Sequence, residues 1–117
     1  MNYDFTGDEL VLALISLIRV VDTRMLQQGP DGFTVDFTPL DRKQGQFSPD
    51  EVLLMKLRVI LESNSESRTL HLDLDDAERR RLAETLSALE GLQAWSPDVL
   101  GLSSGMRQRL LAEDGPA

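Results

Sequence analysis

The 117-residue sequence contains no cysteine and a single histidine, His71. The missing cysteine excludes a disulfide framework, a thiolate zinc site and a cysteine nucleophile. One histidine does not supply the three or four protein ligands that zinc normally takes within one chain. The aspartates also do not follow the spacing of a calcium-binding loop. We therefore expect no metal, no cofactor and no catalytic set.

Aromatic and basic residues are scarce. Aromatics make up 5% of the chain against 41% hydrophobic residues, which predicts an aliphatic core. Twenty acidic residues against twelve basic ones give a net charge of -8. This balance argues against a nucleic-acid surface or an anionic membrane surface, and it favours a basic partner electrostatically.

The one basic run covers positions 79–81. Asp75, Asp76 and Glu84 flank it, and several of these acids lie four residues from an arginine, the spacing of ion pairs along a helix. We interpret the run as a solvated helix face whose charges neutralise one another, rather than as a nucleic-acid contact.

The longest apolar run, at positions 10–21, is too short to cross a membrane. Ser16 and Arg19 interrupt it and Asp22 follows it, whereas a span needs about 20 apolar residues. Acidic residues precede the run where a signal peptide carries positive charge. We therefore expect no membrane contact and a cytoplasmic location.

This apolar run predicts a central helix over positions 7–27. Thr6 and Glu9 have the spacing of a capping box, in which each side chain bonds the other residue's backbone amide. Apolar residues then cover more than half of the helix circumference, and Leu12 and Leu26 interrupt its polar side. A helix on the edge of a monomer has a narrower apolar stripe, so this helix needs partners on at least two sides.

Other helices or a second subunit can supply those partners. The residues that we expect at such an interface are Leu12, Leu14, Ile18, Leu26 and Trp95. For Trp95 two interpretations stay open: a plug at the end of the core, or an exposed anchor for a partner.

The remaining pattern predicts an α+β fold that is mostly helical, in the order α-β-α-β-α-α. Period-two alternation indicates strands, and serine or aspartate caps indicate helix starts. The second helix has two apolar faces, so we expect it to be packed on both sides. The expected elements after the first helix are a strand at 33–37, an exposed loop at 40–46, a helix from 49, a strand at 68–74, a helix from 76, a short helix from 97 and a last one from 103 to 111.

We expect residues 1–111 to form one globular domain and residues 112–117 to fray. Two short strands are marginal alone. They should therefore pair with each other and lie against the first two helices, or continue across a dimer into a four-stranded sheet.

The segment Gly101-Leu-Ser-Ser-Gly105 matches the G-x-S-x-G pattern of a nucleophile elbow. That motif needs a strand before it and an acid and a histidine after it, and His71 comes earlier. We interpret Ser103 instead as a helix cap. The alternative is an anion bound by backbone amides at that helix start, near Arg107 or Arg109.

Together these features predict a non-catalytic protein-interaction or regulatory module that forms a homodimer. One alternative is a small-molecule-binding protein or enzyme with a pocket between the strands and the first helix. A second alternative is an acidic inhibitor or immunity-type protein that binds a basic partner, because opposite charge accelerates association.

Overall fold

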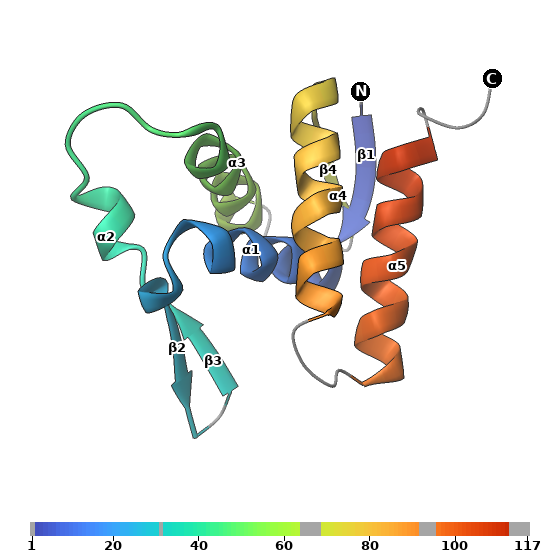
Figure 1. The fold of residues 1–117 in the computed structure, drawn as a ribbon, viewed down its shortest axis with the longest axis horizontal. Coiled ribbons are helices and arrows are strands. Elements are labelled where there is room, and N and C mark those ends of the chain that lie inside the picture. Colours follow the sequence, from blue (N-terminus) through green and yellow to red (C-terminus); the bar gives the residue numbers. More distant parts are fainter. Residues whose placement is uncertain (1, 31, 64–68, 92–95, 113–117) are drawn as a thin grey trace.

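The computed structural model describes residues 2–30, 32–63, 69–91 and 96–112, and its helices surround one aliphatic core (Figure 1). The predicted fold class is confirmed: the structure is α+β and mostly helical, with two small antiparallel sheets. In chain order the elements are β1 (Asn2–Thr6), α1 (Gly7–Val21), the 3-10 turn η1 (Thr23–Met25), β2 (Leu26–Gly29), β3 (Gly32–Val35), α2 (Thr38–Asp41), α3 (Pro49–Ser63), β4 (Thr69–Asp73), α4 (Asp76–Glu90) and α5 (Pro97–Leu111).

Helix α1 begins as predicted but ends six residues earlier. Its capping box is formed: the Glu9 amide donates to the Thr6 hydroxyl at 3.2 Å, and the Thr6 amide donates to the Glu9 carboxylate at 2.9 Å. At the other end Asp22 is extended and its carboxylate accepts from the Arg24 amide at 3.0 Å. This local bond competes with helix continuation. The prediction of a helix to position 27 was therefore wrong.

The two predicted strands exist but do not pair with each other. β3 pairs with β2, with Leu26 opposite Val35. β4 pairs with β1 at the start of the chain, with Phe5 opposite Leu70. The two sheets lie at opposite ends of α1 in Figure 1. β1 was missed, although Tyr3 and Phe5 are buried and alternate with exposed residues.

Helix α3 begins where the sequence predicts. The Ser48 hydroxyl accepts from the Glu51 amide at 3.2 Å, and the Glu51 carboxylate accepts from the Ser48 amide at 2.9 Å. The preceding loop is exposed from Asp41 to Pro49, but it begins after the short helix α2, which buries Leu40. The loop prediction therefore fails only at its first residues.

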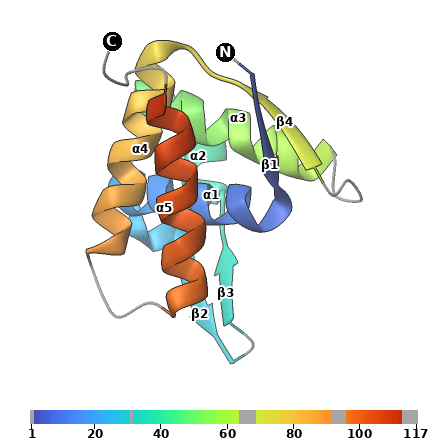
Figure 2. The same ribbon diagram turned by 90° about the vertical axis from the view of Figure 1, so that its right-hand side faces the viewer.

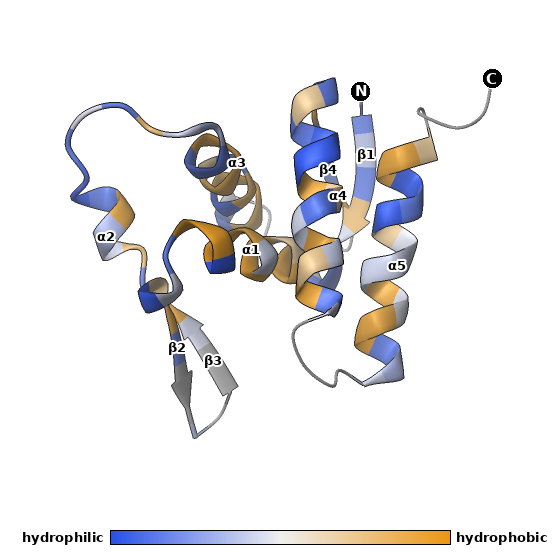
Figure 3. Ribbon diagram, viewed as in Figure 1, coloured by the Kyte–Doolittle hydropathy of each residue, from blue (hydrophilic) through white to orange (hydrophobic). Residues whose placement is uncertain are grey.

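The core forms where α1 packs against α3 and α4, with α5 lying along α4 (Figure 2). Figure 3 shows that α1 is hydrophobic over most of its length. Leu82, Leu86 and Leu89 form a narrow apolar stripe along α4 and are buried in this core. The buried hydroxyl groups of Ser16 and Thr85 are hydrogen-bonded at 3.0 Å, and this bond links α1 to α4.

The two short helices predicted near the end of the chain are one helix, α5. Ser96 caps it by accepting from the Val99 amide at 3.3 Å. Ser103, predicted as the cap of a second helix, is buried in the middle of α5. Its hydroxyl donates to the Glu90 carboxylate at 2.9 Å. A partner on α4 therefore satisfies the serine, and the helix does not break there.

The basic run is not one solvated face, so that interpretation was wrong for Arg79. The Arg79 side chain is only 3% exposed, and it donates to the Leu110 carbonyl and to the Asp76 carboxylate, both at 3.0 Å. Arg81 donates to Asp50 of α3 instead, at 2.8 and 3.0 Å. The run therefore connects α4 to both α5 and α3.

Gly105→Ala is expected to stabilise the chain by roughly 1 kcal/mol, because glycine inside a helix costs about that much relative to alanine. An added Cβ at Gly105 would meet no other atom within 4 Å, and the residue has no positive φ. Urea denaturation measures the change in unfolding free energy. A destabilised variant would show that the glycine has a structural role within the chain.

Candidate functional site

One face of α3 exposes a row of three apolar side chains. Val52, Met55 and Val59 are 49%, 36% and 59% exposed. Their spacing of three and four residues places them on one side of the helix. We call these three residues the α3 row. The sequence predicted packing on both apolar faces of this helix, but only the opposite face, with Leu54 and Leu57, is buried in the core.

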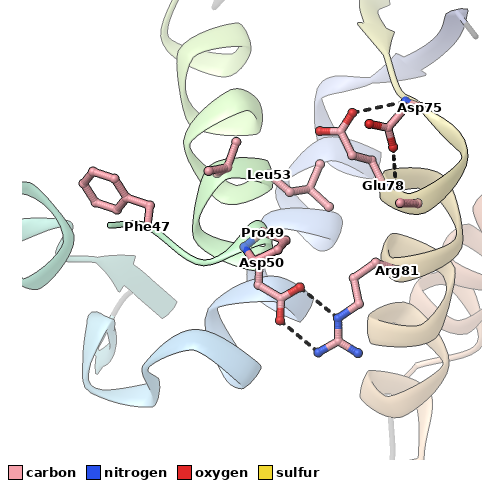
Figure 4. A pocket seen from close by; sticks show the side chains of 9 residues that line it. Phe47, Pro49, Asp50, Leu53, Asp75, Glu78 and Arg81 are labelled. Carbon is pink, nitrogen blue, oxygen red and sulfur yellow. Dashed lines mark hydrogen bonds and ion pairs between the residues drawn. The ribbon is translucent and has the colours of Figure 1, made fainter. Parts of the chain in front are cut away.

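An apolar pocket of about 310 Å³ adjoins the α3 row, between the first turns of α3 and α4 (Figure 4). Val52 belongs both to the row and to the pocket, so the two form one continuous surface. The side chains that line the pocket are Phe47, Pro49, Asp50, Val52, Leu53, Asp75, Ala77, Glu78 and Arg81.

Asp50, Glu78 and Arg81 at the pocket form ion pairs within the chain, whereas the Asp75 carboxylate accepts from the Glu78 amide at 2.7 Å. Figure 4 shows the Arg81 guanidinium facing the Asp50 carboxylate, and their two hydrogen bonds raise the pKa of Arg81. The Lys56 ammonium donates to both Glu78 carboxylate oxygens at 2.9 Å. Because most of the lining is apolar and the charged groups other than Asp75 are paired, the pocket suits apolar groups.

On the other side of the α3 row, one basic side chain is paired with two acidic ones. Arg58 is paired with Asp41 at 2.6 Å and with Glu62 at 3.2 Å, and its guanidinium lies 4.2 Å from the centre of the Phe37 ring. The basic side chains on both flanks of the row are therefore paired within the chain, and one negative charge is in excess beside Arg58.

The residues that the sequence placed at an interface lie mostly in the core of this chain. Leu12, Leu14 and Ile18 are at most 7% exposed, because helices of the same chain cover them. Leu26 is half-buried in β2, and Trp95 lies outside the described residues. The apolar circumference of α1 therefore no longer argues for a second subunit. The exposed apolar side chains of the α3 row favour a second subunit instead. Their apolar spacing can be read from the sequence, but their exposure cannot.

The other sequence motifs do not converge on a chemical site. His71 lies on the exposed face of β4, where a ring nitrogen contacts the Asp4 carboxylate. Across the described ranges no three histidine, aspartate or glutamate side chains are grouped as a metal ion would need. Gly101–Gly105 lies within α5, so the structure offers neither a nucleophile elbow nor the helix start on which the anion alternative depended.

No protein-family model, curated protein or solved structure matches the chain. In the part of the chain that the structure describes, no helix has the length and apolarity needed to cross a membrane.

Acid is expected to destabilise the fold, and Glu51 and Glu90 are two of the carboxylates that contribute. The hydrogen bond from Arg107 holds the pKa of Glu90 below its usual value, and the one from Lys43 does the same for Glu51. A lowered folded-state pKa adds stability above the unfolded glutamate pKa of about 4.3, and that stability is lost as the pH falls further.

Urea denaturation between pH 7 and pH 3 should therefore show a flat stability down to about pH 5.5 and a decline below about 4.5. Glu90→Gln should be less stable at neutral pH and show a shallower decline. If the unfolding free energy of Glu90→Gln falls with acid as steeply as that of the unchanged chain, Glu90 does not contribute to the acid destabilisation.

Proposed function

We propose that the chain is a cytoplasmic, non-catalytic interaction module that forms a homodimer by packing its α3 row against the row of a second copy. The observation that carries the proposal is the exposure of Val52, Met55 and Val59 on one helix face beside an apolar pocket. Apolar helix faces of this kind are typical of helix-mediated recognition. The absence of cysteine agrees with a reducing compartment.

An antiparallel arrangement suits this row. If Met55 lies at a two-fold axis, Val52 of one chain faces Val59 of the other, because the row is nearly symmetric about its middle residue. Such a contact is self-complementary, as a two-fold interface requires. Antiparallel helices also place the partial positive end of each beside the partial negative end of the other.

Local charge supports a second copy as the occupant. Lys56 with Glu78 is neutral, and Arg58 with Asp41 and Glu62 carries one net negative charge, so both basic side chains beside the row are already paired within the chain. A second copy that packs through apolar side chains does not have to break these pairs. At longer range two chains of net charge -8 repel each other, and salt screens that repulsion over a Debye length of about 8 Å at physiological ionic strength.

Sedimentation equilibrium tests the proposal. One chain has a mass of 13.1 kDa, and at tens of micromolar we expect twice that mass. Raising the salt concentration from 50 to 500 mM should strengthen the association, because it screens the net repulsion. A chain that stays monomeric at millimolar concentration, or an association that salt weakens, would contradict the proposal.

A further inference from the structure

A second apolar groove lies between α1 and α5, away from the α3 row; in Figure 1, α3 and α5 stand on either side of α4. The groove has a volume of about 300 Å³. It exposes Val11 at 45% and Leu102 at 37%, with the partly buried Ile15 and Val99 beside them. These side chains form a continuous apolar floor contributed by two helices.

The groove continues over α5 into a shallow hollow of about 520 Å³. Gly101 and Gly105 line this hollow, and a Cβ at either position would meet no atom of the chain within 4 Å. The wall formed by α5 is therefore flat, and the backbone of another helix can approach it closely.

Charge at this groove is acidic. Asp8 lines the groove and Asp98 lines the hollow, and both are exposed without an ion pair to any other described residue. The basic side chain nearby, Arg109, is already engaged: it lies 3.7 Å from the Glu9 carboxylate, and its guanidinium lies 4.6 Å from the centre of the Phe5 ring. The charge that the groove offers to a partner is therefore negative.

We propose that the groove between α1 and α5 binds an amphipathic helix of another protein that has an apolar stripe flanked by lysine or arginine. The stripe packs on Val11 and Leu102, and the basic side chains reach Asp8 and Asp98 at the edges. A second copy of this chain fits less well, because a homotypic contact here would oppose these unpaired carboxylates. This feature separates the groove from the α3 row, whose flanking basic side chains are each paired with carboxylates of the same chain.

A labelled synthetic peptide of leucine and lysine, patterned as an amphipathic helix, is the probe, and fluorescence anisotropy measures its binding. We expect Leu102→Glu to weaken binding at least tenfold and Val59→Glu, on the α3 row, to change it less than twofold. A peptide with glutamate in place of every lysine should bind at least tenfold more weakly. Raising the salt concentration should weaken binding of the lysine peptide.

A double variant, Asp8→Asn with Asp98→Asn, keeps the apolar floor and removes the charge. It should weaken the lysine peptide several-fold while its circular dichroism spectrum matches that of the unchanged chain. Equal binding of the two peptides, equal effects of Leu102→Glu and Val59→Glu, or a loss confined to Val59→Glu would overturn the proposal. A loss of binding confined to Val59→Glu would mean that the peptide occupies the α3 row and not the groove between α1 and α5.

Discussion

Val59→Glu is expected to weaken dimerisation about a thousandfold. Burying an unpaired carboxylate at each of two symmetry-related contacts costs roughly 2 kcal/mol apiece, and the total of about 4 kcal/mol corresponds to three factors of ten in the dissociation constant. Because Val59 is mostly exposed in the single chain, the stability of the monomer should change by less than about 0.5 kcal/mol. Sedimentation equilibrium gives the first quantity and urea denaturation of dilute protein gives the second.

Val20→Glu is the matched control. Val20 is a valine of α1 that is 44% exposed and lies outside the α3 row. Its replacement introduces the same charge into the same chain, so any effect of raising the net charge appears equally in both variants. We expect Val20→Glu to associate like the unchanged chain. If both variants lose association to the same degree, net charge rather than the α3 row is responsible.

The second large effect concerns folding: Arg79→Ala is expected to destabilise the chain by about 3 kcal/mol. The variant leaves the buried Leu110 carbonyl without this donor and removes the packed stem of a side chain that lies inside the protein. The bond to Asp76 contributes less, because that carboxylate is exposed and water screens it. Urea denaturation at neutral pH measures the loss.

Arg80→Ala is the natural comparison, because Arg80 lies in the same basic run and is exposed. Its substitution should change stability by less than about 0.5 kcal/mol, as is usual on a surface. Similar small effects at both positions would restore the interpretation of the run as one solvated helix face.

The helix starts could be predicted because their causes are local. Thr6, Ser48 and Asp75 each accept a hydrogen bond from the amide three residues later. In return, the backbone amide of each cap residue donates to the carboxylate of the glutamate at that later position. These contacts depend only on spacing within one turn. At the start of α5, Ser96 likewise accepts a hydrogen bond from the amide three residues later, that of Val99.

The strand pairing and the buried polar residues could not be predicted, because their partners are distant in the sequence. β1 and β4 are more than sixty residues apart, and neither sequence segment identifies the other. Ser103 and Arg79 resemble surface or capping residues until α5 is placed along α4.

The α3 row is an intermediate case between these two. The apolar pattern of Val52, Met55 and Val59 is explicit in the sequence, but the position of α1 decides which of the two apolar faces of α3 the core buries. The interface candidates Leu12, Leu14 and Ile18 on α1 are likewise covered by helices of the same chain. The wide apolar surface of α1 has to be buried, but the sequence does not show whether the same chain or a second chain buries it.

Disulfide formation by a single introduced cysteine tests the proposed contact, because the natural chain contains none. In the antiparallel arrangement Met55 faces its own copy at the two-fold axis, where two cysteines come within bonding reach. Met55→Cys should form a covalent dimer under mild oxidation at micromolar concentration, while Val20→Cys stays monomeric. Equal cross-linking of both variants, or none with Met55→Cys, would contradict self-association through the α3 row.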